Sequence, residues 1–344
     1  MDISVFLGAA LVLLGGILLG VFALPMKYAR QWEFEHIWLV FALTGFILFP
    51  WLLNLATIPR LAEIYASAPT RSLWMIMLFG FGWGIGATLV GLGVKMLGIG
   101  LGLAIILGLS ASAGSLVPLL ILTPQKIFTS QGHFYLIGTA VMFGGIAGVA
   151  VAGLLRERAE RLLKGEQSPG SSQKVFLSGL LVCVAAGLLS SFLNFSYAFG
   201  TETIETARRL GTSPLWAPNA AAALATTGGF VANAVYCLYL LRRNGTASRF
   251  RLPGTASHWL FGLMMGGFWY GGLAIYGMGI NRMGDFGTVV GWPLLMGTNI
   301  IASNVAGLAT GEWASAGARA KVWLAGGCLI ILAAVVILAL AQKP

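Results

Sequence analysis

The sequence predicts an all-α integral membrane protein, with ten transmembrane helices arranged as two inverted five-helix repeats. Three observations support this prediction: an apolar composition, ten apolar runs of helix length, and a pattern of glycine and tryptophan that occurs twice. Of the 344 residues, 58% are hydrophobic and 9% are charged, and the mean hydropathy is +0.86. A soluble globule of this size would need more polar residues to cover its surface. We therefore expect the chain to lie in a lipid bilayer.

Ten segments are long enough to cross the membrane, because about 20 apolar residues in a helix span the hydrocarbon core. The longest polar stretch, residues 156–174, contains Ser, Pro and Gly and is predicted to be a flexible linker. We expect a first repeat over residues 1–156, a cytoplasmic linker over 157–174 and a second repeat over 175–344. The ten segments are residues 4–25, 36–57, 72–94, 98–121, 134–155, 175–197, 215–241, 258–280, 286–309 and 321–342.

An internal repeat relates the two halves. A shift of 186 positions places Trp83 on Trp269 and brings the short basic turn at Lys95 close to that at Arg282. The same shift matches Gly80, Gly86, Gly91, Gly93 and Gly98 with Gly266, Gly272, Gly277, Gly279 and Gly284. Glycines allow helix backbones to approach closely in a bilayer, where no water drives apolar surfaces together. The repeated pattern therefore predicts two related halves with close helix packing.

Basic residues are concentrated in the connections that follow the odd-numbered segments. By the positive-inside rule this side is cytoplasmic, so both termini are expected to face outward. Because five is odd, the second half enters the membrane from the opposite side, which gives the inverted repeats typical of transporters. Fourteen of the 21 Lys and Arg residues lie on this side: Lys27, Arg30, Lys95, Arg156, Arg158, Arg161, Lys164, Lys174, Arg242, Arg243, Arg249, Arg251, Arg319 and Lys321.

No motif in the sequence indicates an enzyme. Cys183, Cys237 and Cys328 lie singly in apolar runs, so neither a disulfide framework nor a metal site is expected. There is no G-x-S-x-G elbow, no GxxxxGK[ST] phosphate loop and no Cys or His pair at metal-ligand spacing. We expect no cofactor. The net charge of +10 resides in the connections, so the expected partner is the bilayer and not nucleic acid.

A pocket for a small polar solute needs aromatic surface and hydrogen-bonding groups, and the membrane segments contain both. Trp83 and Trp269 are favoured because they occupy equivalent positions in the two halves and are flanked by glycines. The alternative is that such residues form ordinary interhelical contacts and interfacial belts. The expected binding residues are Trp83, Asn194, Tyr197, Asn233, Trp269, Tyr270, Tyr276 and Asn299.

The proton carrier is less evident, because no Asp or Glu is centred in a predicted span. Carboxylates inside a membrane are costly and usually functional. Glu202 and Glu205 follow the sixth segment on the outer side, and Asp285 precedes the ninth. These three are the candidates for proton coupling. The alternatives are a solvated helix face for the two glutamates and a helix cap for Asp285.

Several motifs carry a family resemblance: FGFGWGIG, GLGVKMLGIGLG, GFWYGGLAIYGMG, EHIW from Glu35, the Pro50 and Trp51 pair, and EWASAG from Glu312. With the order of the spans, these motifs resemble the L-rhamnose/proton symporter family, a branch of the drug/metabolite transporter superfamily. The resemblance covers nearly the whole chain. It implies a ten-helix carrier of the inner membrane that takes up a deoxy sugar with a proton, and it implies that both termini lie outside.

The chain departs from that family pattern at polar positions. Asparagines expected in the third span are Ala87 and Leu89, the glutamine expected after the Trp-Tyr pair of the eighth span is Gly272, and a Tyr-Asp-Tyr expected in the ninth is replaced at residues 287–289. We therefore expect recognition to involve spans six, seven and eight more strongly.

The function predicted from these observations is secondary active transport by alternating access. The expected transport is proton-coupled uptake of a sugar such as L-rhamnose or a related small polar solute. Two alternatives stay open at this point. One is an exporter of drugs or metabolites from the same superfamily, and the other is a membrane scaffold that transports nothing.

Overall fold

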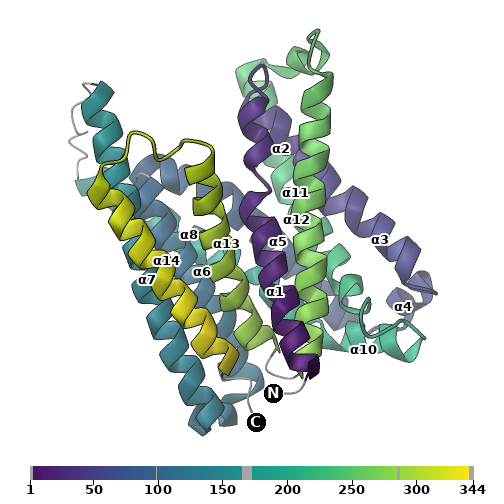
Figure 1. Cartoon of the computed structure of the whole chain (residues 1–344). Helices are drawn as coiled ribbons and strands as arrows, with labels where there is room; N and C mark the ends of the chain where they lie inside the picture. Colours follow the sequence, from purple (N-terminus) through teal and green to yellow (C-terminus); the bar gives the residue numbers. More distant parts are fainter. Residues whose placement is uncertain (1–2, 98, 165–172, 285–286, 341–344) are drawn as a thin grey trace.

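A computed structural model describes residues 3–97, 99–164, 173–284 and 287–340. All regular secondary structure in these ranges is helical (Figure 1). The long helices of the first half are α1 (Ile3–Val21), α2 (Phe34–Leu43), α3 (Phe49–Thr57), α5 (Thr70–Leu97), α6 (Ile99–Leu122) and α7 (Ser130–Lys164). Those of the second half are α8 (Gln173–Ser190), α11 (Pro218–Asn244), α12 (Ala256–Arg282), α13 (Gly287–Ala309) and α14 (Ala318–Leu340). Shorter elements are η1 (Leu24–Tyr28), the π-helix η2 (Thr44–Leu48), α4 (Leu61–Ser67), η3 (Pro124–Phe128), α9 (Phe192–Ala198), α10 (Thr201–Arg209) and η4 (Ala247–Arg251).

The expected multi-pass helical architecture is confirmed. Nine helical segments in the described ranges are long and apolar enough to cross a membrane. The remaining expected segment, residues 258–280, forms the 27-residue helix α12, which is not among those nine. Gly, Trp and Tyr are frequent in α12, and these residues contribute less hydropathy than Leu, Ile or Val. The helix that carries Trp269 thus falls outside the nine most clearly apolar segments.

Two helices connect the two sides of the molecule. Figure 1 shows α6, α7, α8, α13 and α14 gathered on one side, and α1, α2, α11 and α12 on the other. Helix α1 packs against both α12 and α13, and α5 packs against both α11 and α8. Helices α7 and α14 lie along one another. Contacts across the molecule therefore depend largely on α1 and α5.

Glycines of the internal repeat lie at the closest of these contacts. A Cβ atom on Gly80 of α5 would lie 2.0 Å from the carbonyl oxygen of Ala225 on α11, and one on the matching Gly266 of α12 would lie 2.2 Å from Thr44 Oγ1. Both positions therefore exclude a side chain. Gly91 differs, because a Cβ atom there would meet no atom within 4 Å.

The expected flexible linker is wrong for its first part. Residues 157–164 complete helix α7, and α8 begins at Gln173. Residues 165–172 lie outside the described part of the chain. Ion pairs one helical turn apart join Arg156 to Glu160 (3.3 Å) and Arg161 to Glu157 (2.5 Å). Pairs at this spacing stabilise a helix, which explains why the charged segment continues α7.

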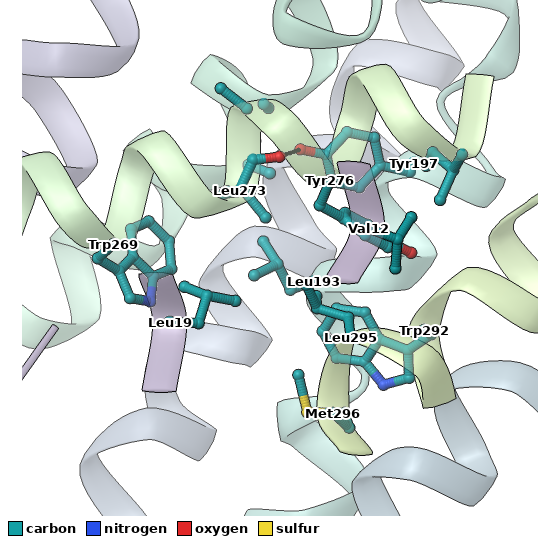
Figure 2. Close-up of a cluster of buried hydrophobic side chains, with 14 of the residues drawn as sticks. Val12, Leu19, Leu193, Tyr197, Trp269, Leu273, Tyr276, Trp292, Leu295 and Met296 are labelled. Carbon is teal, nitrogen blue, oxygen red and sulfur yellow. Dashed lines mark hydrogen bonds between the residues drawn. The ribbon is translucent and has the colours of Figure 1, made fainter. Parts of the chain in front are cut away.

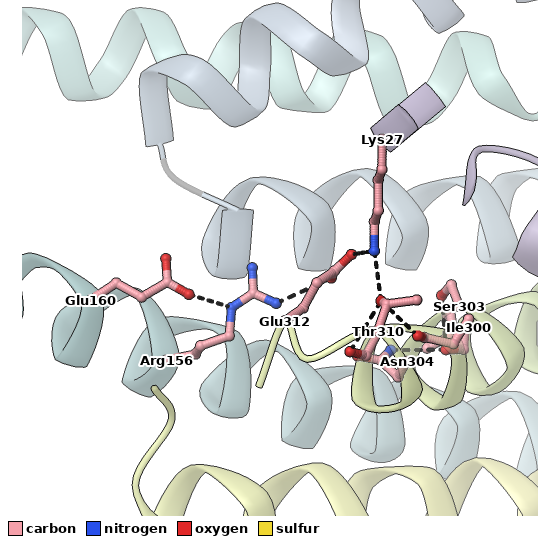
Figure 3. A network of polar contacts seen from close by, with 10 residues as sticks. Lys27, Arg156, Glu160, Ile300, Ser303, Asn304, Thr310 and Glu312 are labelled. Atoms are coloured by element: carbon pink, nitrogen blue, oxygen red, sulfur yellow. Dashed lines mark hydrogen bonds and ion pairs between the residues drawn. The ribbon is translucent and has the colours of Figure 1, made fainter. Parts of the chain in front are cut away.

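A polar network joins η1, α7 and the α13–α14 connection (Figure 3). Glu312 forms ion pairs with Lys27 of η1 and, at 3.6 Å, with Arg156 of α7. Lys27 also donates a hydrogen bond to Thr310 (2.7 Å), and the Arg156 guanidinium lies 5.0 Å from the ring centroid of Trp313. One carboxylate thus holds two basic side chains from elements far apart in sequence.

Replacing Gly80 with Ala is expected to lower the thermal stability of the purified protein. The added methyl group overlaps the α11 backbone, and overpacking of this kind typically costs about 1–3 kcal/mol. The matched control is Gly91→Ala in the same helix, where space is available. Melting curves in detergent should show a lower midpoint for Gly80→Ala alone. Equal midpoints for the two variants would contradict the proposed packing.

Candidate functional site

Two tryptophans from the two halves of the chain stack on each other. The rings of Trp83 (α5) and Trp269 (α12) have centroids 5.2 Å apart and planes inclined by 22°. The ring of Phe46 from the π-helix η2 contacts both indoles. Its centroid lies 4.9 Å from that of Trp83 and 4.7 Å from that of Trp269. Gly229 on α11 provides room, because a Cβ atom there would lie 2.4 Å from the Trp83 ring. The two tryptophans that the internal repeat relates are therefore in direct contact.

These aromatic rings form one wall of a cavity of about 240 Å³. A water molecule needs only roughly 10–15 Å³ measured in this way, so the cavity has room for a small solute. Figure 2 shows Trp269 and Trp292 with Leu19, Leu193 and Leu295, which all belong to the lining. The full lining is Leu19, Phe22, Trp38, Phe41, Phe46, Trp83, Ala87, Val90, Ile106, Leu107, Ser110, Ser190, Leu193, Trp269, Leu273, Trp292, Leu295, Met296 and Asn299.

Three neutral polar side chains line this cavity without hydrogen-bond partners in the described ranges: Asn299 on α13, Ser110 on α6 and Ser190 on α8. An amide and two hydroxyls offer both donors and acceptors. No charged residue belongs to the lining. The cavity is therefore suited to an uncharged solute that has one apolar face and a few hydroxyl groups.

Asn194 lies outside the cavity lining and bonds to the start of α13. Its Nδ2 donates hydrogen bonds to the carbonyl oxygens of Gly114 (2.7 Å) and Thr288 (3.0 Å), and its Oδ1 accepts one from the Tyr276 hydroxyl (2.5 Å). This fully buried side chain thus joins α9 to α6, α13 and α12. The ring of Tyr276 also packs edge-on against Trp292, with ring centroids 5.9 Å apart. Asn194 and Tyr276 do not belong to the cavity lining.

The polar atoms of three further expected residues form hydrogen bonds with other protein groups. Asn233 accepts a hydrogen bond from Trp38 Nε1 (2.9 Å) and donates to the Gly84 carbonyl (3.3 Å) and to the Gly229 carbonyl of its own helix (2.9 Å). The Tyr270 hydroxyl donates to Asn219 Oδ1 (3.4 Å), and the Tyr197 hydroxyl donates to the Leu273 carbonyl (3.5 Å). Of the eight expected residues, the cavity lining therefore contains Trp83, Trp269 and Asn299.

The expected proton-coupling residues lie elsewhere. Glu202 lines a second pocket of about 780 Å³, whose lining includes Tyr197 but neither tryptophan of the stacked pair. Glu205 lines the same pocket and forms an ion pair with Arg208. Asp285 lies outside the described residues. Neither described glutamate belongs to the lining of the cavity with the stacked tryptophans.

The prediction from sequence missed several lining residues. Ser110 and Ser190 gave no signal, because serines are common in glycine-rich membrane helices. Phe46 was missed because the π-helix that directs it toward the tryptophans is not apparent in the sequence; such segments often occur at functional sites. Trp38 lies within the EHIW motif, which indicates the family resemblance but not a position at the cavity.

Comparison with known proteins extends this description. The family model for the L-rhamnose-proton symport protein matches residues 1–343. The L-rhamnose-proton symporter of Yersinia pestis (strain Pestoides F) is 27% identical over 341 residues, which cover 97% of each chain. That of Mannheimia succiniciproducens is 28% identical over 340 residues, which cover 96% of each chain. These relatives are named as transporters and not as enzymes. Because the family model spans nearly the whole sequence, this chain belongs to the L-rhamnose-proton symport protein family.

Proposed function

We propose that the protein takes up L-rhamnose, or a related uncharged sugar, together with a proton by alternating access across the inner membrane. The observation that carries this proposal is the cavity between the two halves, with its stacked tryptophans and unpaired neutral polar groups. A deoxy sugar has an apolar face that suits an indole ring and hydroxyl groups that suit amides and hydroxyls. The names of the relatives support the same substrate and the same coupling ion.

The proposed roles of the expected residues follow from their contacts. Trp83 and Trp269 form the stacking surface, and Asn299 binds solute hydroxyl groups. Asn194, Tyr197, Asn233, Tyr270 and Tyr276 hold the surrounding helices, because their polar atoms already bind protein groups. The Asn194–Tyr276 hydrogen bond joins α9 to α12, together with the Tyr197–Leu273 hydrogen bond. These two contacts form the proposed barrier on the side where α13 begins.

For the architecture, we propose ten spans in two inverted five-helix repeats within the drug/metabolite transporter superfamily. The helix contacts support this arrangement, because they occur in matching pairs when α1, α5, α6 and α7 are equated with α8, α12, α13 and α14. Helix α1 packs on α12 as α8 packs on α5, and α1 packs on α13 as α8 packs on α6. The α7–α14 contact maps onto itself. Inverted repeats of this kind build alternating-access carriers.

The orientation places the end of α7 in the cytoplasm and both termini outside. Most basic residues lie on that side, as the positive-inside rule requires. The cavity extends from the tryptophan pair toward this side, through Phe22 near the end of α1 and Trp38 near the start of α2. The described conformation then corresponds to the inward-facing form of the carrier.

Asn299→Ala is expected to weaken binding of L-rhamnose without preventing folding. Loss of a hydrogen bond between neutral groups costs about 0.5–1.5 kcal/mol, which corresponds to about a two- to twelve-fold higher Kd. Asn304→Ala is the matched control, because Asn304 lies on the same helix and bonds only the Ile300 carbonyl (2.8 Å). Equilibrium binding of radiolabelled L-rhamnose to purified protein measures both variants. Unchanged affinity for Asn299→Ala would refute the assigned role.

Single cysteines test the orientation. In a variant with Cys183, Cys237 and Cys328 replaced by Ala, we expect an impermeant maleimide to label Glu63→Cys on α4 in cells with a permeabilised outer membrane. Arg158→Cys at the end of α7 should be labelled only after the inner membrane is also opened. Both native side chains are exposed, so access to the reagent depends on the side of the membrane. The reverse labelling pattern would invert the proposed topology.

A further inference from the structure

Glu35 is the one Asp or Glu in the described ranges whose side chain is buried, with 3% of its surface exposed. It lies in the first turn of α2, within the membrane-spanning segment Phe34–Thr57. A carboxylate in such a place is costly to keep charged unless a cation compensates it. No Lys, Arg or His of the described residues forms an ion pair with it.

The hydrogen bonds of Glu35 leave one carboxylate oxygen available. Asn244 Nδ2 donates to Oε1 at 3.0 Å, and Thr246 Oγ1 donates to the same oxygen at 2.8 Å. No other side chain of the described residues donates to Oε2. Both donors are neutral and lie at the end of α11 or just after it. The carboxyl group is therefore held in position through Oε1, and no described side chain donates to Oε2.

Other titratable groups lie around Glu35, and none of those described forms an ion pair with it. His36 Nε2 donates a hydrogen bond to the Thr246 carbonyl of the α11–α12 connection at 2.9 Å. Cys237 on α11 is buried, and Arg249 of η4 is paired with Glu33 at 2.6 Å. The other basic groups of this region are the exposed Arg242 and Arg243 of α11, the exposed Arg251 of η4 and the buried His258 of α12.

Helix α2 connects Glu35 to the cavity. Trp38 lies one turn after Glu35, and it lines the cavity together with Phe41 and with Phe46 of the following π-helix. Trp38 Nε1 donates to Asn233 on α11, so Glu35 and Trp38 both bond α11 or its end from the same face of α2. A change in the Glu35 contacts therefore acts directly on the helix that carries two cavity-lining rings and leads into the π-helix with the third.

We propose that Glu35 is the proton-binding site that couples proton movement to solute transport, an inference that rests on the proposed symport function. Its Oε2 accepts one proton from water on one side of the membrane, forming an O–H bond, and returns that proton to water on the other side. No electrons are transferred. Protonation removes the negative charge that binds Asn244 and Thr246, so α2 is released relative to α11 and the aromatic wall of the cavity moves with it.

This assignment differs from the candidates expected from sequence. The Glu205 carboxylate is already paired with Arg208, and Glu202 is exposed to solvent. An exposed carboxylate exchanges protons with only one aqueous side unless it moves. Glu35 is buried at the start of a helix that forms part of the cavity wall, and this position allows its access to depend on the conformation of the carrier.

The test compares two transport modes of Glu35→Gln in proteoliposomes with radiolabelled L-rhamnose. Gln retains an oxygen for Asn244 and Thr246 but does not titrate. We expect uphill accumulation driven by a pH gradient to be lost, at least ten-fold below wild type, while exchange of internal for external L-rhamnose stays within about two-fold. Glu33→Gln and Glu202→Gln are the controls, and both should accumulate solute as wild type does.

Each outcome decides the question. Gradient-driven accumulation by Glu35→Gln would overturn the proposal, and so would loss of exchange in this variant, which would indicate a purely structural role. Accumulation lost in Glu202→Gln and retained in Glu35→Gln would move the proton site to the second pocket. If the wild-type protein itself shows neither exchange nor accumulation of L-rhamnose, then the proposed function fails, and that result is distinct from failure of the Glu35 assignment.

Discussion

The stacked pair of Trp83 and Trp269 is the contact on which the central part of the structure depends. It requires the Phe46 ring against both indoles and a residue without a side chain at Gly229. Helices α5 and α12 reach this distance because their glycines allow backbone contact with α11, α8, α1 and η2. The cavity lies beside this pair, and residues of α6 and α13 line its other walls.

Amide side chains explain why so few polar groups face that cavity. In a bilayer an unpaired amide is costly, so most asparagines bond to neighbouring helices. Asn194 and Asn233 each use both amide atoms in this way. Asn299 is the exception among the expected asparagines, because no hydrogen bond of its side chain is present in the described ranges. That difference, and not the residue type, is the reason why we propose Asn299 as a ligand-binding group.

The helical segments could be predicted from the sequence because they depend on local hydropathy. The tryptophan pair could be predicted because the internal repeat relates its two members. The sequence could not distinguish Asn299 from Asn194, since their roles depend on which neighbouring carbonyls lie within reach. It also placed Glu35 at the end of a span, where a carboxylate is normally solvated. The fold buries Glu35 because η4 and the end of α11 pack over the start of α2, and this contact between distant segments leaves no signal in hydropathy.

Helix α2 offers a physical route by which a proton and a solute influence one another. It begins with the buried carboxylate of Glu35, continues with Trp38 at the cavity wall and ends in the π-helix Thr44–Leu48 that carries Phe46. Thr44 Oγ1 anchors this segment to the Gly262 carbonyl of α12 (3.0 Å). A shift at the start of α2 is therefore transmitted along this helix toward the anchored π-helix that carries Phe46. Such segments often occur at functional sites. A solute resting on Phe46 and the two indoles restricts that motion, and by thermodynamic linkage it changes the proton affinity of Glu35 to the same extent that the proton changes solute affinity.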